Sequence, residues 1–455
     1  MYELIVVGAG IAGCVTAKKA AEKGIEVLLL DKRPLEEIGN NWTNGVEKSV
    51  FKKVKIAPPG SNELALPHKR YRLLSPGGEY VELPEVPMYE INMRPFTRRL
   101  LDEAIKAGVE FRDNALVSGP YLRDDKIHGV IVDGEPILAA IVMDASGYNA
   151  AIRNNLPRSS IVPIDVYEQI KLTAYRGQIR IEDDSVDVPS ILGIPSDITI
   201  SYGAWRGGFS ILSICWHSSQ RALDILIGFD STKYNDTAKE CFDSFLKEHG
   251  LKGEFVYGGG GPIPIRRSID VIVDDAFLTA GDAACMVIPI HGSGVASSMI
   301  AGNAAAKAVV GCIKTENVGK DVLWNYAVEY QRGRGAMMAF FDVMRMSLEI
   351  LTPEETDRLV GSVMTPEDII SGLEARLPKI NLFTIIFRIK SLRHPKTVMR
   401  LLTVGKVAYK VKSHYKKYPR FYSARRLKRW QSELNRILAP IKMIRYEAER
   451  LESDS

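Results

Sequence analysis

The stretch IVVGAGIAGCVTAKKAAEKGIEVLLLD, residues 5–31, joins an apolar run, a glycine-rich turn, a segment of helical character and a second apolar run. This order predicts a strand–helix–strand unit of about 30 residues. Gly8, Gly10 and Gly13 form the pattern G-x-G-x-x-G at the first strand–helix junction. There the first glycine permits a tight turn, the second admits a pyrophosphate to the backbone, and the third lets the helix pack closely on the strand.

An acidic residue ends the second predicted strand. Asp31 follows the turn at the distance expected for an acid that hydrogen-bonds a ribose hydroxyl. Such an acid suits a ribose hydroxyl better than a 2′-phosphate, so the adenosine of FAD or NAD is favoured over that of NADP. The alternative is a glycine-rich turn in an unrelated α/β domain. The flanking strand, the helix and Asp31 together predict a dinucleotide-binding domain.

A second stretch of small side chains lies far downstream. GDAACMVIPIHGSGVASSMIAGNAAA, residues 281–306, follows the predicted strand in FLTAGDAA and opens into a predicted helix. Side chains this small build little core, so the backbone here is predicted to be kept clear for a ring system. A plain Ala/Gly helix-packing surface is the alternative. FLTAGDAA resembles the second flavin signature of the two-dinucleotide-fold flavoproteins, in which the Asp hydrogen-bonds the ribityl chain and the helix N-terminus faces the flavin.

The chain totals bound the class of protein. The 455 residues are 46% apolar and 25% charged, which is ordinary for a globular protein of two or three domains. The five cysteines are scattered, which argues against zinc, predicts no metal site and favours a reducing compartment. The N-terminus has no basic region before its apolar run, and no run of about 18 apolar residues predicts a membrane span. We therefore expect a cytoplasmic protein.

Hydrophobic patterning divides the chain into four parts. Residues 1–160 hold the glycine turn, a helix at 94–108 and strands at 126–134 and 139–148. Partial period-two alternation at 161–258 predicts an inserted antiparallel substrate domain, and the glycine run that begins at Tyr257 is expected to break that pattern. Residues 259–330 return to the dinucleotide-binding domain, and 331–455 form a basic helical region. The predicted fold class is α/β, with a Rossmann-like FAD-binding domain.

Five stretches narrow the resemblance further. DASGY at 144–148, followed by Arg153, resembles a strand-end motif of the aromatic hydroxylase class of flavoproteins. GGGGPIPIRR, the Gly-Asp segment with HGSG, and YKKYPRF near the C-terminus are similar to motifs of the archaeal geranylgeranyl reductase family. The loop DKRPLEEIG after the second strand also fits that family. The resemblance covers most of residues 1–330 and, more thinly, the tail.

The resemblance implies an FAD-dependent reductase that saturates carbon–carbon double bonds in the prenyl chains of membrane lipids or isoprenoid quinones. It implies an external electron donor, NADPH or ferredoxin. The FAD contacts predicted from the glycine turn and the resemblance are Gly8, Gly10, Ala12, Gly13, Asp31, Lys32, Thr43, Asn44, Gly45, Arg94, Arg99, Val117, Asp282, Gly292, Ser293, Gly294 and Val295.

The chain departs from the family pattern in three places. The family's aromatic stretch ending in Phe-Pro appears here as YGAWRGGF, with Tyr202 and Trp205 retained but no proline. Where the family has a Cys-Gly pair near the flavin ring, this chain has Thr43-Asn44-Gly45. In NMRPF the arginine of the family's Asp-Arg is displaced by one position, so Arg94 and Arg99 are competing candidates. Tyr202 and Trp205 could line a prenyl channel or belong to a sheet core. His291 could shape the pocket or relay a proton, or it could be a loop histidine satisfied by backbone. No residue is predicted as the catalytic proton donor.

The C-terminal charge predicts an anionic partner surface. Between Arg376 and Arg445 lie 20 Lys and Arg and one acid, whereas the rest of the chain has 40 basic and 54 acidic residues. Apolar residues interleave with these charges, as in helices that lie in a membrane interface, so we expect a protein peripheral to the membrane. The alternatives are docking on the acidic body of the same protein and, without any accompanying motif, nucleic acid; no nucleic-acid partner is predicted.

Two other functions stay open on the same fold. One is a flavin monooxygenase or oxidase of a small apolar molecule, for which a compact closed pocket is expected. The other is a non-catalytic prenyl-lipid carrier that holds no flavin. A wide apolar tunnel is expected only if a prenyl chain is bound.

Overall fold

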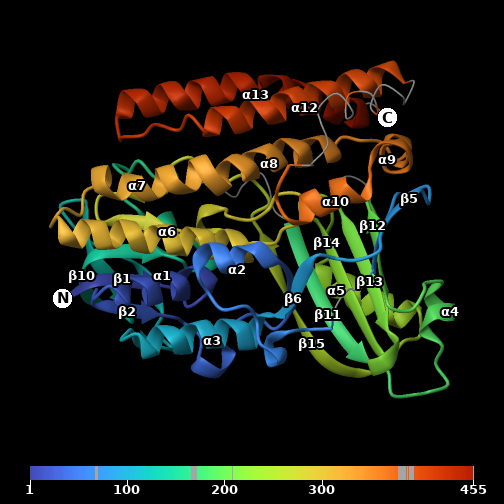
Figure 1. Cartoon of the computed structure of the whole chain (residues 1–455), viewed down its shortest axis with the longest axis horizontal. Coiled ribbons are helices and arrows are strands. Elements are labelled where there is room, and N and C mark those ends of the chain that lie inside the picture. Colours follow the sequence, from blue (N-terminus) through green and yellow to red (C-terminus); the bar gives the residue numbers. More distant parts are fainter. Residues whose placement is uncertain are drawn as a thin grey trace.

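The computed structural model in Figure 1 describes residues 1–66, 70–164, 166, 172–206, 209–377, 386, 388 and 394–453. The predicted N-terminal unit is present. Strand β1 (Tyr2–Val7) leads into α1 (Ile11–Ala21) and then β2 (Val27–Leu30), and the two strands pair in parallel. The strands are buried because Leu4, Val6 and their neighbours on both faces are apolar, as a parallel sheet covered by helices requires.

These strands belong to a mixed sheet whose core is parallel. Its order is β16-β17-β10-β1-β2-β7. The further strands are β7 (Glu110–Arg112), β10 (Glu135–Asp144), β16 (Val273–Asp274) and β17 (Phe277–Thr279), with β8 (Val117–Arg123) and β9 (Lys126–Val132) added antiparallel beside β10. Because β16 and β17 come from a segment more than 100 residues after β10, the sheet is completed only when the chain returns. The Rossmann-like part is therefore discontinuous in sequence.

Helices α6 (Val295–Lys314) and α3 (Met93–Lys106) both pack against α1. Gly302 of α6 allows this close approach, because a Cβ there would lie 2.8 Å from the Ala12 carbonyl oxygen. In the described part of the chain, α6 is the one helix long and apolar enough to cross a membrane, and 72% of its most apolar window is buried inside the protein. Helix α6 is therefore a core helix of the protein.

A second, seven-stranded sheet lies beside the first, in the order β15-β11-β14-β13-β12-β4-β5. All neighbours are antiparallel except β12 and β4. Its strands are β4 (Arg70–Leu74), β5 (Tyr80–Leu83), β11 (Leu172–Arg180), β12 (Ile198–Gly203), β13 (Ile211–His217), β14 (Ala222–Asp230) and β15 (Glu254–Ile263). Helix α5 (Ala238–Glu248) packs on one face with an apolar core. Helix α4 (Val188–Leu192) lies between β11 and β12 in the chain and contributes Val188 to that core.

We expected the glycine run that begins at Tyr257 to end the strand pattern, and this expectation was wrong. Strand β15 continues through it and pairs with β11 along its length. Glycine is required in this part of β15 because the neighbouring strand β11 leaves no room for a side chain. A Cβ on Gly260 would lie 2.4 Å from the Ala174 carbonyl oxygen, and one on Gly258 would lie 2.4 Å from the Tyr175 hydroxyl. The sheet therefore uses β15 to Ile263 and takes β4 and β5 from residues 70–83, which lie outside the segment predicted as the inserted domain. The four-part division of the chain stays a prediction.

The C-terminal region is helical, as predicted. Its helices are α7 (Lys320–Tyr330), α8 (Ala336–Leu348), α9 (Pro353–Arg358), α10 (Pro366–Leu373), α12 (Pro395–Tyr415) and α13 (Ala424–Ser453), with π-helical turns at Gln331–Gly335 and Leu359–Val363. Helix α12 packs on α8 and α13 packs on α12 (Figure 1). The fold class predicted from the sequence is confirmed.

Two motifs that are far apart in the sequence meet where the segment after α12 contacts the rest of the protein. Arg267 of IPIRR donates a hydrogen bond from Nε to the Tyr415 hydroxyl at 3.1 Å. Tyr418 of YPR donates to the Asp270 carbonyl oxygen at 2.8 Å, and the Trp324 indole donates to the Pro419 carbonyl oxygen at 2.8 Å. Both motifs therefore tie the C-terminal helices to the body.

Candidate functional site

The glycine turn has the geometry that a pyrophosphate needs. Gly8 has φ of +104°, and a Cβ there would lie 2.3 Å from the Ala145 carbonyl oxygen. A Cβ on Gly13 would lie 2.0 Å from the Gly8 carbonyl oxygen, so the helix can approach the strand only with glycine at this position. Around Gly10, by contrast, no atom lies within 4 Å of a Cβ position. The turn therefore has no room for side chains at Gly8 and Gly13, whereas the space beside Gly10 is open. This open space lies at the N-terminus of α1, which is an anion-binding arrangement.

Asp31 closes the turn from the end of β2. Its Oδ2 accepts a hydrogen bond from the Ala9 amide at 2.8 Å, and its Oδ1 accepts from the backbone and side chain of Arg33 at 2.9 and 3.2 Å. Val117, at the start of β8, is buried nearby: Ala115, two residues before it, donates its amide to the Asp31 carbonyl oxygen at 2.9 Å. Lys32 is exposed beside this turn. These predicted FAD contacts thus share one end of the parallel sheet.

The structure brings the second small-residue segment to the glycine turn. A Cβ on Gly281 would lie 3.5 Å from the Cβ of Ala12, and one on Gly294 would lie 3.2 Å from Oδ1 of Asp282. Val295 begins α6 directly after Gly294, so Asp282 lies against the N-terminus of that helix. The turns predicted to hold opposite ends of one coenzyme are therefore neighbours in space.

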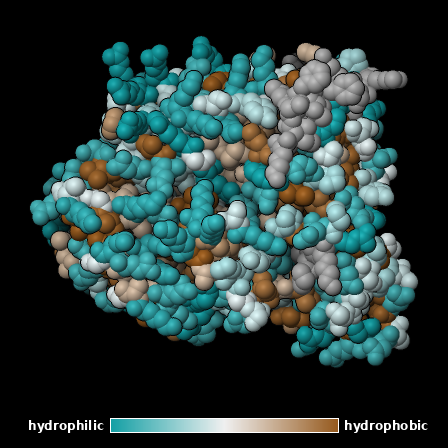
Figure 2. Space-filling model, viewed as in Figure 1, coloured by the Kyte–Doolittle hydropathy of each residue, from teal (hydrophilic) through white to brown (hydrophobic). Residues whose placement is uncertain are grey.

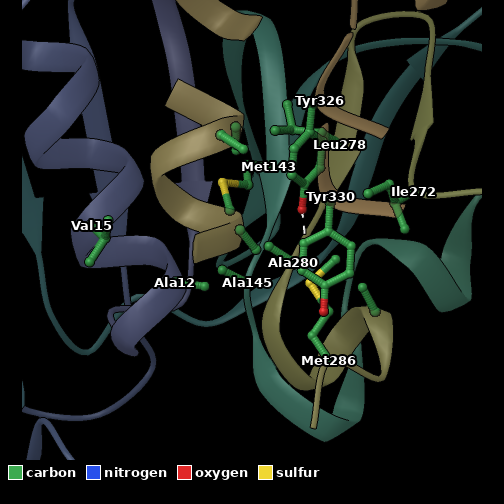
Figure 3. Close-up of a cluster of buried hydrophobic side chains, with 14 of the residues drawn as sticks. Ala12, Val15, Met143, Ala145, Ile272, Leu278, Ala280, Met286, Tyr326 and Tyr330 are labelled. Carbon is green, nitrogen blue, oxygen red and sulfur yellow. Dashed lines mark hydrogen bonds between the residues drawn. The ribbon is translucent and has the colours of Figure 1, made fainter. Parts of the chain in front are cut away.

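Figure 3 shows the apolar cluster that supports these turns. Ala12, Ala145 and Ala280 meet there, from α1, the end of β10 and the end of β17. Tyr326 of α7 fixes the last of these strands by donating its hydroxyl to the Thr279 carbonyl oxygen at 2.9 Å. Small side chains therefore lie where the loops leave the strand ends, and larger side chains of the cluster pack beside them.

The DASGY motif also folds around its acid. Oδ2 of Asp144 accepts hydrogen bonds from the backbone amides of Ile152 and Arg153 at 3.0 and 2.7 Å. Its Oδ1 accepts from the hydroxyl of Ser146 at 2.6 Å. The Arg153 side chain is fully buried and donates to the carbonyl oxygen of Pro163 at 2.9 Å. The hydrogen bonds of this motif hold the loop whose Ala145 backbone lies against Gly8.

Burial raises the pKa of Asp282 to about 6. An unfolded Asp has a pKa of about 3.9, so without flavin the folded chain binds the proton more tightly and loses stability as pH rises from about 4 to about 6. Asp282→Asn should remove this loss. Urea unfolding of flavin-free protein should show the variant gaining stability relative to the wild type across this window and no further above it. A difference that is constant with pH would contradict this assignment.

The loops predicted at the flavin ring also meet. The Ser293 hydroxyl donates to the Gly45 carbonyl oxygen at 3.2 Å, which joins the loop before α6 to β3 (Thr43–Glu47). Strand β3 pairs with β6 (Met88–Asn92), and α2 (Lys48–Val54) follows it. Thr43, Asn44 and Gly45, predicted in place of the family's Cys-Gly, therefore lie beside Gly292 and Ser293.

His291 lies in the same loop and is partly exposed, while its Nε2 atom is buried. Its Nδ1 accepts from the Ser293 amide at 3.3 Å, which leaves the proton on Nε2. Nε2 makes no hydrogen bond of normal geometry to a described residue, although the backbone of Gly372 and Leu373 is close enough to favour its protonation. Burial, followed by the charge of Arg334, lowers the His291 pKa to about 4, so the ring is neutral at pH 7.

The two competing arginines are in different surroundings. Arg99 is engaged by Glu63 at 2.6 Å and by Glu103 at 2.7 Å. Arg94 packs behind Gly39, and its buried Nε has no hydrogen-bond partner among the described residues. An orphaned buried donor is expected where a ligand supplies the acceptor. The geometry favours Arg94 as the cofactor contact, and both assignments stay predictions.

A cavity of about 610 Å³ begins at these loops and runs between the antiparallel sheet and the C-terminal helices. Its floor is the face of the sheet opposite α5, because alternate residues of each strand line it. These floor residues are Leu172, Ala174 and Arg176 on β11, Thr199, Ser201 and Gly203 on β12, Ile211, Ser213 and Cys215 on β13, and Asp224, Leu226 and Gly228 on β14.

The roof of the cavity comes from the helices. Its residues include Phe340, Phe341 and Met344 of α8, Val360 and Val363 of the second π-helical turn, Ile369 and Leu373 of α10, and Leu401, Val404 and Tyr409 of α12. At the inner end the walls are Trp42 to Gly45 and Ile290 to Ser293, which are the predicted flavin-ring loops. A long apolar molecule in this space would therefore have one end at those loops.

Tyr202 and Trp205 are not brought into the cavity. Tyr202 alternates with the floor residues Ser201 and Gly203 and packs with the core under α5, as does Trp205. Sequence reasoning missed the helical roof and a charged cluster in the floor. The signal for the cluster was present, since Arg176 and Asp224 are charged residues in the middle of the predicted strands.

Comparison with known proteins agrees with this geometry. Residues 6–57 match the family model of the NAD(P)-binding Rossmann-like domain. A digeranylgeranylglycerophospholipid reductase of Sulfolobus acidocaldarius is 24% identical over 451 residues, which cover 96% of this chain and 97% of the relative. Among solved structures, a geranylgeranyl bacteriochlorophyll reductase-like protein of Thermoplasma acidophilum aligns with a TM-score of 0.68 at 20% identity, over 89% of this chain and 99% of that protein.

A flavin-dependent brominase aligns with a TM-score of 0.60 at 16% identity, over 87% of this chain and 100% of the brominase chain. The fold is thus shared with flavin-dependent enzymes of different chemistry. The resemblance predicted from the sequence motifs is confirmed: along nearly its whole length this chain is similar to a digeranylgeranylglycerophospholipid reductase, and its fold matches that of a geranylgeranyl bacteriochlorophyll reductase-like protein.

Proposed function

We propose that this protein is an FAD-dependent reductase that saturates carbon–carbon double bonds in the prenyl chains of membrane lipids. The observation that carries the proposal is the cavity, which is largely apolar and joins the predicted flavin-ring loops to the C-terminal helices. A prenyl chain needs this kind of long apolar space, and a small substrate of a monooxygenase does not. The relationship to reductases named for digeranylgeranylglycerophospholipid supports the same substrate class.

The residues present fit FAD. The open space at Gly10 admits a pyrophosphate, Asp31 lies where the ribose of an adenosine is expected, and Asp282 stands at the N-terminus of α6. The orphaned Nε of Arg94 offers a further donor. Reduced FAD would supply a hydride equivalent to the double bond. The role of the cavity walls is to hold the chain and to exclude water and oxygen, which would consume the reduced coenzyme.

The proposal is tested by anaerobic incubation of the chemically reduced, flavin-loaded protein with prenylated lipids and isoprenoid quinones, followed by mass measurement. A gain of two hydrogens per double bond in a lipid supports the reductase. Unchanged masses for every lipid and quinone refute it. Tight binding of a lipid without flavin in the purified protein would indicate a carrier, and hydroxylation in air would indicate a monooxygenase. Parallel reductions with NADPH and with ferredoxin identify the donor.

We also propose that the C-terminal helices attract the protein to an anionic membrane surface. The apolar residues of α13 that interleave with its charges are used for packing: Leu427, Trp430, Leu434 and Leu438 are buried against the rest of the protein. The basic side chains are exposed, and hydrophilic side chains project along this edge in Figure 2. Attraction to headgroups rather than deep insertion is therefore expected.

The exposed turn between α12 and α13 gives a test. Lys416, Lys417 and Arg420 are exposed there beside Phe421, which is 61% exposed. Each basic residue near an anionic bilayer contributes about 1 kcal/mol, so the triple variant K416E/K417E/R420E should bind anionic vesicles roughly 100-fold more weakly.

The control for this test is K233E/K247E/K252E, which reverses three exposed charges on the antiparallel domain. It should bind anionic vesicles as the wild type does. Equal losses of vesicle binding in the two variants would show that only net charge matters and would refute a docking face.

A further inference from the structure

Three hydroxyl groups meet in the floor of the cavity. Ser201 of β12 and Ser213 of β13 are directly opposite each other in the sheet, and their hydroxyl oxygens lie 2.5 Å apart. Tyr71 of β4, the strand on the other side of β12, lies within hydrogen-bond reach of the Ser201 hydroxyl. All three side chains line the cavity, and Ser201 is fully buried. These three residues are the hydroxyl cluster.

The strand register places the hydroxyl cluster at a fixed distance from the predicted flavin-ring loops. One row of cross-strand partners crosses the floor, formed by Arg176 on β11, Leu226 on β14, Ser213 on β13, Ser201 on β12 and Leu73 on β4. Arg176 marks the ring-loop end of this row, because it donates a hydrogen bond to the Thr43 carbonyl oxygen at 3.1 Å. Neighbouring strands are about 4.8 Å apart, so Ser213 lies about 10 Å and Ser201 about 14 Å from Arg176 along the row.

The hydroxyl cluster has one hydrogen-bond donor more than it uses. Each hydroxyl carries a single proton to donate, so three hydroxyls have three donors. The contact between Ser201 and Ser213 uses one donor, and the contact between Ser201 and Tyr71 uses a second, whichever group donates in each. Within the described part of the chain these three hydroxyls make no other hydrogen bond. One O–H group is therefore left for a molecule in the cavity.

The surroundings of the hydroxyl cluster select a neutral acceptor. Its neighbours in the row, Leu226 and Leu73, are apolar, and a donor without an acceptor in such a place is costly. A buried phosphate would need a cation beside it. The cation of this row, Arg176, lies two strands from Ser213 and is paired with carboxylates on β6 and β14. An uncharged oxygen is the group that fits.

We propose that the hydroxyl cluster binds the neutral oxygen that joins a prenyl chain to its glycerol, and thereby selects which double bond lies at the ring loops. The inference rests on the proposed function. The prenyl hydrocarbon itself has no acceptor, and this oxygen is the first acceptor at its end. With the oxygen held at the cluster, two to three strands from Arg176, the number of carbons between it and the bond nearest the ring loops is fixed.

The first test measures binding to the full-length, flavin-loaded protein with its flavin kept oxidised, so that no reduction takes place. The probes are a geranylgeranyl glycerol ether and an analogue in which CH₂ replaces the linking oxygen. A buried donor that loses its acceptor weakens binding about 5- to 150-fold, so wild type should bind the ether more tightly than the analogue by that factor. The variant Tyr71→Phe/Ser201→Ala/Ser213→Ala should bind the two probes equally.

Thr173→Val is the control variant. It removes a hydroxyl from the same sheet, on the face opposite the cavity, and should keep the wild-type preference for the ether. Equal affinity of wild type for the two probes would overturn the inference without reference to any variant. So would the same preference in wild type and in the triple variant, because a loss of stability alone weakens the binding of both probes alike.

The second test follows the order in which the double bonds are saturated. With reducing equivalents for one double bond per chain, wild type should convert the ether to one main isomer, located by fragmentation in the mass spectrometer, and the triple variant should give a mixture. The same single isomer from both proteins would contradict the selecting role. If wild type prefers the ether in binding but leaves it unreduced, the hydroxyl cluster is supported as a binding site and the proposed reductase function fails.

Discussion

Gly10→Val is expected to yield a folded protein that has lost FAD. Gly10 lies in extended backbone, with φ of −79° and ψ of −174°, and no atom lies within 4 Å of a Cβ there. Valine is therefore tolerated by the fold, but its side chain fills the space in front of the α1 N-terminus where a pyrophosphate would approach. We expect affinity for FAD to fall at least about 100-fold, a loss of about 3 kcal/mol, measured by calorimetric titration of flavin-free protein.

Gly311→Ala is the matched control, because Gly311 also has no atom within 4 Å of a Cβ position and lies far along α6. It should bind FAD like wild type. Both variants should unfold near the wild-type urea midpoint when flavin-free. Wild-type affinity in Gly10→Val would place the coenzyme elsewhere and remove the basis of the proposed function.

Ala174→Phe should separate flavin binding from lipid reduction. Ala174 is buried in the floor of the cavity on β11, so a phenyl ring at this position occupies the space assigned to the prenyl chain. We expect the rate of lipid reduction to fall at least about 100-fold, because a chain held short of the reacting position loses the benefit of proximity. Flavin absorbance and affinity should not change. The measurement is mass analysis of the lipid product beside a flavin titration.

Thr173→Phe is the control for this variant. Thr173 is the preceding residue of the same strand and points to the opposite face of the sheet. It should retain lipid reduction. If both variants reduce lipid at the wild-type rate, the cavity is not the prenyl site. If both lose flavin, the substitutions act on the sheet and not on the cavity.

The parts of the fold that depend on local pattern were predictable from the sequence. The helix at 94–108 appears as α3 at Met93–Lys106, and the strand at 126–134 appears as β9. In both cases periodicity and flanking turn residues lie within one short segment. The glycine turn also follows from local chemistry, because each glycine has its own steric requirement.

The parts that depend on long-range contacts were not predictable. Strand β15 runs through a glycine tract because Tyr175 and Ala174 of a strand some 80 residues earlier leave no room for side chains. Tyr202 shows the same limit at the site: alternation places it on one face of β12, but only the packed structure shows which face has the cavity. Likewise, the hydrogen bonds of Arg176 to Glu90 and Asp224 join three strands from separate segments.

Helix α12 has two different sides. Leu401 and Val404 form part of the wall of the cavity, while Lys406 and Lys410 on the same helix are exposed among the basic residues of the C-terminal region. In the proposed function, selectivity for chain length and attraction to the bilayer would thus both depend on this one helix of about six turns. A homologue adapted to bulkier lipids would have to change this helix without weakening its hold on the membrane, so the two properties are expected to evolve together.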